Sequence, residues 1–249
     1  MKEFKIEKKK NIFLIYFSFL LLYIILGELT PILNFLPKPQ ILLDSFFSLW
    51  TDYNLLAELG ITTFTVYVGI FLGVLILEIT SGVLVKFLSS NKYSLELFKF
   101  LKYFPAFFFA ILFSFWFPVS IIAQLVFVVL AFVSIMFVPI QNALKNVNES
   151  YVDSALSYKV SESKLSKIIW KDSQPKIYSN LNRIHYYVWT LVMIFEYIGT
   201  FNGVGSVYYN AHNYNDYAAF FSLAVLIAFL IWIGDSLIIL IKNKLIDWE

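Results

Sequence analysis

Long apolar runs separated by polar stretches dominate the pattern along the chain. The first begins after Asn11 and reads IFLIYFSFLLLYIILGELTPIL, close to the roughly 20 residues that cross a bilayer as a helix. A secretory signal would have a shorter apolar region, of about 7–15 residues, and a small-residue cleavage site, so we expect this run to be retained. The pattern predicts an all-α protein with six transmembrane helices at residues 12–33, 59–87, 97–117, 119–141, 184–201 and 217–241.

Two further segments combine apolar and polar positions. Residues 40–50 have Asp44 and Ser45 between apolar side chains, which predicts a short external amphipathic helix at the membrane interface. Residues 142–183 are polar, and their apolar positions recur at three- and four-residue spacings, which predicts amphipathic helices outside the membrane. We expect residues 1–249 to form a single transmembrane domain that includes both segments.

Composition agrees with this pattern. The 249 residues are 59% hydrophobic and 14% charged, whereas soluble domains are usually about 45–50% apolar and 25% charged. The chain has no cysteine and only two histidines, so it has no disulfide framework and no cysteine metal site. We therefore predict no bound metal and no cofactor on this chain, and the net charge of +2 gives no reason to expect a nucleic acid partner.

The positive charges indicate the orientation of the six predicted spans. Of the 19 lysine and arginine residues, all but Lys38 fall at the two ends of the chain, within residues 142–183, or in the stretch that joins the second and third spans and includes their facing ends. Cytoplasmic loops are enriched in lysine and arginine. This distribution predicts that both termini and the segment 142–183 are cytoplasmic.

The segment YVDSALSYKVSESKLSKIIWKDSQPKI resembles the coupling loop of permease subunits of bacterial ABC (ATP-binding-cassette) importers. Asp153, Ser154 and Ala155 stand at the Glu-Ala-Ala positions of that loop, Lys159 at its glycine, and Pro175 at its second proline. Glycine takes a positive φ without steric cost, so Lys159 predicts a reshaped turn or a different partner groove.

The resemblance continues without gaps through the fifth span and covers nearly the whole chain. The closest pattern is that of permeases of sulfonate, taurine, nitrate and thiamine-precursor importers. The positions that carry it outside the coupling loop are Pro37, Pro39, Gly69, Pro105, Trp116, Phe117, Trp189, Glu196, Gly199, Gly203, Val204, Gly205, Asp235 and Trp248.

The resemblance implies a type I importer fold and a set of partners. Two permease subunits, identical or different, would form the pathway, two cytoplasmic ATPase subunits would bind below them, and an external binding protein would deliver a small organic anion or heterocycle. This chain has no Gly-Lys-Ser/Thr phosphate loop, so ATP and Mg²⁺ would be bound by the partner ATPase. The residues implied in ATPase coupling are Asp153, Ser154, Ala155, Ser157, Lys159, Val160, Ser161 and Pro175.

Ionisable residues within spans are costly and are therefore functional candidates. Glu78 would line the pathway or accept hydrogen bonds from a neighbouring helix, and Glu196 would act as an anchor or a gate. For Asp235 we expect a cytoplasmic lysine as partner. Trp116, Phe117 and Trp189 are candidates for an aromatic gate, although tryptophan is also enriched at membrane interfaces.

Three alternatives remain open from the sequence. A gradient-driven secondary transporter would have paired charges and broken helices in two corresponding halves, which are not evident here. A membrane-bound enzyme would have clustered histidines and carboxylates at one membrane face. A degenerate structural subunit of a heterodimeric permease would share the fold, and the altered Asp153 to Lys159 stretch keeps that alternative open.

Overall fold

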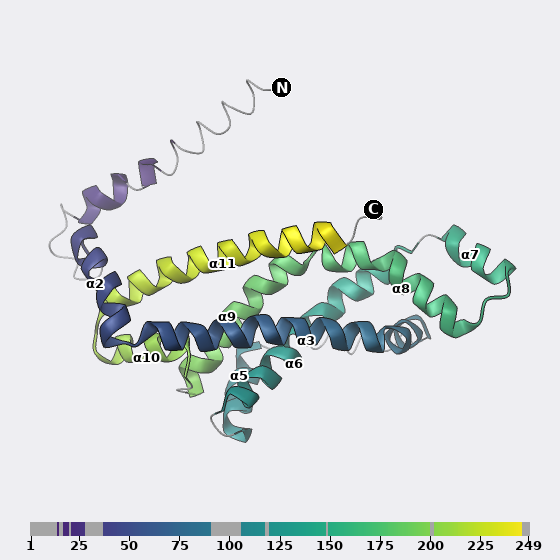
Figure 1. Ribbon diagram of the computed structural model, residues 1–249, viewed down its shortest axis with the longest axis horizontal. Helices are drawn as coiled ribbons and strands as arrows, with labels where there is room; N and C mark the ends of the chain where they lie inside the picture. Colours follow the sequence, from purple (N-terminus) through teal and green to yellow (C-terminus); the bar gives the residue numbers. More distant parts are fainter. Residues whose placement is uncertain are drawn as a thin grey trace. The chain divides into compact units, whose positions relative to one another are not determined.

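The computed structural model describes residues 14, 17–19, 21–27, 37–90, 106–117, 120–147, 149–199 and 202–245. All regular secondary structure in these ranges is α-helical (Figure 1). The chain divides into two compact units, which are described separately. The first contains residues 1–55 and 210–227, and the second contains residues 56–209 and 228–249. The helices α10 (Val204–Asn213) and α11 (Tyr217–Leu245) have residues in both units.

Within the described ranges, three helices are long and apolar enough to cross a membrane. They are α3 (Leu55–Ser90), α6 (Ile121–Leu144) and α11. At 1.5 Å per residue, the 36 residues of α3 extend roughly 54 Å, well beyond a hydrocarbon core of about 30 Å. Part of α3 therefore lies outside the hydrocarbon core, or the helix is strongly tilted.

Two shorter helices overlap other predicted spans. The apolar helix α5 (Ala106–Trp116) covers the second half of the prediction at 97–117, whose first half lies outside the described residues. The helix α9 (Leu181–Gly199) covers the prediction at 184–201. The prediction at 12–33 lies largely outside the described residues. The described part of the chain is that of an all-helical membrane protein, and the count of six spans stays a prediction.

The first unit contains α2 (Pro39–Asp52), which begins with a proline in its first turn. Proline suits this position because the first amide groups of a helix have no partner within it. The Ser222 hydroxyl donates a hydrogen bond to the Leu42 carbonyl, 2.8 Å away. Tyr53 donates to Asp216 across 3.0 Å, and burial together with this carboxylate raises the pKa of Tyr53 to about 12. These bonds join α2 to the start of α11.

In the second unit, α9 packs against α5 and α6, and α6 also packs against α8 (Glu162–Tyr178). Aromatic side chains fill the contact of α5, α6 and α9. Phe127 of α6 stacks on Phe195 of α9 with ring centroids 4.5 Å apart, and Phe113 of α5 meets the edge of the Phe195 ring. Residues with a large apolar surface and defined geometry make this contact well ordered.

Candidate functional site

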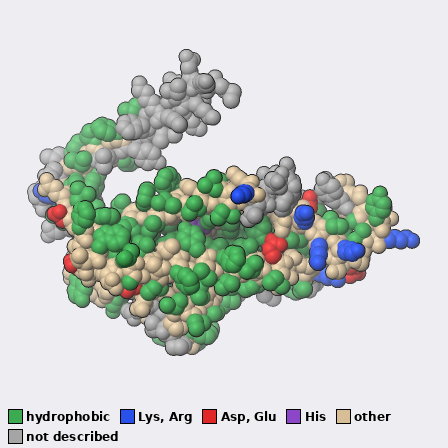
Figure 2. Space-filling view, in the orientation of Figure 1, with side chains coloured by type: hydrophobic (Ala, Val, Ile, Leu, Met, Phe, Trp, Pro, Cys, Tyr) green, Lys and Arg blue, Asp and Glu red, His purple; other side chains and the backbone are tan. Residues whose placement is uncertain are grey.

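The segment that resembles a coupling loop folds as two helices, α7 (Glu149–Ser157) and α8. Asp153, Ser154 and Ser157 are exposed on α7, and Ala155 is buried. The hydroxyls of Ser154 and Ser157 donate to backbone carbonyls one turn earlier. The Asp153 carboxylate therefore stands on an exposed face among serines that bond within their own helix. Figure 2 shows Lys and Arg side chains gathered around this part of the second unit.

The turn between α7 and α8 keeps the backbone conformation that a glycine would adopt. Lys159 has a φ of 52°, in the left-handed region. The Val160 amide bonds to the Ala155 carbonyl over 3.1 Å, which is the long-range bond of a Schellman cap, with Lys159 at the position that usually holds glycine. Lys159 thus takes the backbone conformation that a glycine would adopt here, and a different partner groove, the other predicted consequence of this lysine, stays a prediction. Ser161 then begins α8.

The helix α8 is attached to α3 through Glu78. The carboxylate of Glu78 accepts hydrogen bonds from Trp170 Nε1 at 3.0 Å, from Gln174 Nε2 at 2.9 Å and from the Tyr178 hydroxyl. The three donors are spaced by four residues and therefore lie on one face of α8. Burial, with the bond to Glu78, raises the pKa of Tyr178, so the phenol stays protonated and remains a donor at neutral pH.

Two other features of α8 affect its attachment. Lys86, eight residues after Glu78 on α3, forms an ion pair with Glu162 at the start of α8, with Nζ and Oε2 3.1 Å apart. Both side chains are exposed, so this pair contributes little to stability. Pro175 is buried within α8 and has no amide hydrogen for the helix ladder. The stronger attachment is therefore the one at Glu78, which was predicted to line the pathway or to accept hydrogen bonds from a neighbouring helix.

A second cluster surrounds Glu196, which is fully buried on α9. Its carboxylate accepts hydrogen bonds from the Thr62 hydroxyl at 2.8 Å and from the Gly205 amide at 2.9 Å. The Thr62 oxygen in turn accepts a bond from the Val204 amide at 2.8 Å. Gly205 and Val204 begin α10, whose first amide groups have no partner within the helix. A carboxylate at this end also complements the helix dipole.

The turn before α10 is held from two more helices. The Gly203 amide donates to the Glu58 carboxylate of α3, and Gln124 Nε2 of α6 donates to the Asn202 carbonyl over 2.7 Å. Gly203 has a φ of 133°, and a Cβ on it would collide with the Glu196 carboxylate. A side chain is therefore excluded there both by conformation and by space.

A third cluster surrounds His185 on α9. Its Nδ1 lies 2.8 Å from Asp235 Oδ1, and its Nε2 accepts a hydrogen bond from Trp189 Nε1 at 2.9 Å and lies 3.2 Å from the Tyr67 hydroxyl. Indole N–H only donates, so Nε2 is the acceptor and the proton of a neutral His185 sits on Nδ1, facing Asp235. The expectation of a lysine partner for Asp235 is wrong, since its described partner is His185.

The residues of the predicted aromatic gate lie in different surroundings. Trp189 is buried in the His185 cluster. Phe117 stacks on Phe113, with ring centroids 4.2 Å apart, and Trp116 is 70% exposed. The structure does not join these three residues in one constriction of the described chain.

The sequence pointed to Glu78, Glu196 and Asp235 as candidates, but not to most of the residues that bond to them. Glu58, Thr62, Tyr67 and Gln124 were not candidates. The donors on α8 had a detectable signal, since Trp170, Gln174 and Tyr178 repeat at one-turn intervals with a polar atom on each. Within the described residues, no group of three or more His, Cys, Asp or Glu side chains is arranged to hold a metal ion.

The chain matches a known protein family. Residues 69–247, more than two thirds of its length, match the family described as the binding-protein-dependent transport system inner membrane component. An all-helical membrane protein of this kind is a transport permease of the ABC importer class. The chain belongs to this family, which confirms the resemblance seen in the sequence at the family level. No curated protein and no solved structure matches the chain.

Membership of this family indicates what kind of protein the chain is. Proteins of this family are transport components and not enzymes, and they work with a substrate-binding protein and an ATPase. The chain is accordingly a multi-pass membrane protein. The matched region includes the segment that resembles a coupling loop and the turn at Glu196, but it begins after Glu58 and Thr62.

Proposed function

We propose that this chain is the permease subunit of an ATP-driven importer and that residues 149–177 couple it to a separate ATPase. The observation that carries the proposal is the attachment of α8 to α3 at Glu78 by three side-chain donors. A coupling segment can transmit force only if it is fixed to a span. The long helix α3 is such a span.

The proposed contact with the ATPase is the exposed face of α7 and the turn that follows it. Asp153, Ser154, Ser157 and Lys159 offer polar side chains there, while Ala155 packs inward and Val160 closes the Schellman cap. Ser161 is the N-cap residue of α8, which follows, and Pro175 lies within that helix. When the ATPase closes on ATP and Mg²⁺, α7 moves with its groove, and α8 carries that displacement to α3 as a rigid-body movement. Alternating access follows from the movement.

The other end of α3 has a different role in this proposal. Glu58 and Thr62 hold the turn at residues 202–205 against Glu196. Roughly 24 Å separates Thr62 from Glu78 along the axis of α3. A rotation applied near Glu78 therefore reaches the turn through a single continuous helix, which makes Glu196 an anchor of the external end of the pathway.

The remaining parts of the proposal follow from the family and the charge pattern. Two permease subunits, identical or different, enclose the pathway in the inner membrane, and both termini and the coupling segment face the cytoplasm, as the lysine distribution predicts. An external binding protein delivers the substrate, for which we propose a small organic anion or heterocycle. ATP and Mg²⁺ are bound by the ATPase alone.

The proposal is tested by affinity purification of the tagged chain in mild detergent, with identification of the proteins that copurify. We expect an ABC ATPase with the parent chain and its loss from the Asp153→Lys variant, because the substitution reverses the charge of the proposed contact. Asp44→Lys is the matched control, since Asp44 is an exposed acid of α2. It should retain the ATPase.

Other outcomes of this purification would favour one of the alternative functions. A well-folded chain that emerges without any ATPase would overturn the proposal and favour a gradient-driven transporter. Recovery of the ATPase with both variants, together with a second and different permease chain, would favour a structural subunit whose partner makes the coupling contact.

A further inference from the structure

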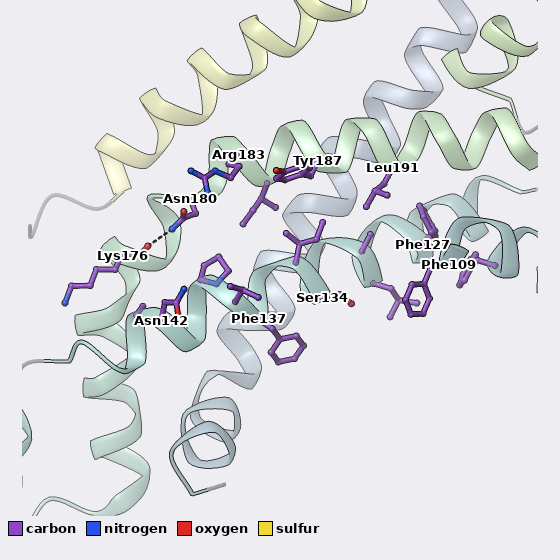
Figure 3. A pocket seen from close by; sticks show the side chains of 18 of the residues that line it. Phe109, Phe127, Ser134, Phe137, Asn142, Lys176, Asn180, Arg183, Tyr187 and Leu191 are labelled. Carbon is purple, nitrogen blue, oxygen red and sulfur yellow. Dashed lines mark hydrogen bonds between the residues drawn. The ribbon is translucent and has the colours of Figure 1, made fainter. Parts of the chain in front are cut away.

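A large cavity in the second unit has two chemically different ends (Figure 3). It has a volume of about 800 Å³ and is lined by α5, α6, the end of α8 and the start of α9. Phe109, Phe113, Phe127 and Leu191 surround one end. Ligand sites commonly have volumes of about 300–1,000 Å³, so the cavity is large enough for an organic molecule.

The opposite end is cationic and rich in amides. Lys176 and Arg183 line it together with Asn142, Asn146 and Asn180. Lys176 Nζ donates to the Asn146 carbonyl over 2.6 Å, which holds the ammonium group at this end. No Asp or Glu is among the described residues that line the cavity. Among the described lining residues there are therefore two positive charges and no carboxylate.

The wall between the two ends is apolar and accessible from outside the protein. Leu130 and Val138 of α6 line it and are 53% and 45% exposed, and Phe109 of α5 is 47% exposed. Both helices carry exposed apolar side chains, which are suited to contact with lipid tails in a membrane. A small hydrophilic anion would fill the cationic end and leave the long apolar wall uncovered.

We propose that this cavity binds an anionic phospholipid, with its head group at the end lined by Lys176 and Arg183 and an acyl chain along the wall of α5 and α6. Basic pockets between transmembrane helices on the cytoplasmic side are suited to anionic lipid head groups. The cationic end lies where the coupling segment joins α9, so the lipid belongs to the cytoplasmic leaflet in the orientation given under Proposed function. A bound lipid there touches α8 and would affect how the coupling segment moves.

The test measures lipid retention by native mass spectrometry of the isolated chain. The protein is exchanged into detergent with phosphatidylglycerol or with phosphatidylcholine of the same acyl chains. We expect selective retention of phosphatidylglycerol and about thirtyfold weaker retention by the Lys176→Gln/Arg183→Gln variant. Each basic residue near an anionic lipid surface contributes about 1 kcal/mol, and 1.4 kcal/mol corresponds to a factor of ten.

Two further variants separate charge from shape. Lys164→Gln/Lys167→Gln removes the same charge from exposed positions of α8 outside the cavity and should retain the lipid like the parent chain. Ser134→Trp places a large ring in the cavity without a change of charge, because Ser134 lines it, and should also weaken retention. Circular dichroism checks that each variant is folded.

Several outcomes would overturn the proposal. Equal retention of both lipids, or unchanged retention by the Lys176/Arg183 variant, would show that the cations do not select the lipid. Displacement of phosphatidylglycerol by glycerol phosphate alone would identify a site for free phosphate anions. Dissociation of a dimer by the cavity variants, with no lipid bound to the parent, would identify an interface between copies. The measurement needs no ATPase, so its failure is distinguishable from failure of the coupling proposal.

Discussion

Two carboxylates, Glu78 on α3 and Glu196 on α9, are held in opposite ways. Glu196 is fully buried, and its partners are the Gly205 amide and the hydroxyl of Thr62, which itself accepts from the Val204 amide. Glu78 is half-buried, and three long side chains of one helix face donate to it. One site is built from backbone in a turn, and the other from side chains that can change rotamer.

This difference predicts that the two sites respond differently when the helices around them move. The turn at Glu196 is closely packed, because a Cβ added to Gly203 or to Gly205 would collide with Glu196. The site at Glu78 can lose one donor and keep the other two while α8 shifts. We therefore expect substitutions in the turn to lower stability most, and substitutions at Glu78 to affect coupling more than stability.

The largest expected effect is that of Gly203→Ala. The substitution puts a side chain at a φ of 133° and a Cβ against the Glu196 carboxylate. Backbone strain costs about 1–3 kcal/mol and overpacking costs about 1–3 kcal/mol, so we expect a loss of about 3 kcal/mol or more. The measurement is thermal unfolding in detergent.

Gly82→Ala is the matched control for Gly203→Ala. A Cβ on Gly82 meets nothing within 4 Å, and alanine favours a helix by about 1 kcal/mol over glycine. Its melting temperature should equal or exceed that of the parent chain. A Gly203→Ala variant as stable as this control would contradict the rigid turn.

The next effect in size is that of Glu196→Ala. It leaves the Gly205 amide and the Thr62 hydroxyl without their acceptor in a buried site, and a buried unsatisfied group costs about 1–3 kcal/mol. Glu196→Gln keeps one acceptor oxygen and should cost about 1 kcal/mol. Thermal unfolding of both variants measures the difference. Equal losses in the two variants would mean that the hydrogen bonds to Glu196 do not hold the turn.

Glu78→Gln should lower stability less than the substitutions in the turn at Glu196, but it should lower the coupling of transport to ATP hydrolysis more. The amide keeps one acceptor oxygen and adds two donors opposite Trp170, Gln174 and Tyr178, which are themselves donors. We expect about 1 kcal/mol of lost stability and a clear drop in substrate transport per ATP hydrolysed in reconstituted vesicles.

The control for Glu78→Gln is Glu162→Gln. It breaks the exposed ion pair with Lys86, which contributes at most about 1 kcal/mol, and it leaves the Glu78 site intact. Its transport per ATP should match that of the parent importer. If both variants transport normally, α8 does not drive α3 through Glu78.

Much of the helical architecture could be predicted from sequence because apolar runs and amphipathic spacing are local properties. The helices α3, α6 and α11 overlap their predicted ranges, and α2, α7 and α8 fall in segments expected to be amphipathic. Helix ends were less predictable. The helix α3 begins four residues before its predicted span of 59–87, since polar Glu58 interrupts the apolar pattern but binds the turn at Gly203.

The partners of the site residues could not be predicted, because they are separated by long stretches of chain. Nothing local to Glu196 indicates that Thr62 donates to it, and nothing local to Asp235 indicates His185. The expectation of a lysine for Asp235 followed from proximity to the basic tail. The buried His185 on α9 is the partner instead, and only the structure shows that it meets Asp235 of α11.

The smallest expected effect is that of Lys159→Gly, and its sign is positive. A left-handed backbone costs a non-glycine residue about 1–2 kcal/mol, while glycine loses about 0.5–1 kcal/mol through its greater freedom in the unfolded chain. The net gain is about 0.5–1 kcal/mol, confined to the cap between α7 and α8. Slower hydrogen exchange of the Val160 amide, which closes that cap, measures it.

Lys164→Gly within α8 is the control and should destabilise by about 1 kcal/mol. Faster exchange in Lys159→Gly would contradict the cap. A slower exchange accompanied by loss of the ATPase would show that this lysine is kept, despite its strain, for a contact with the partner.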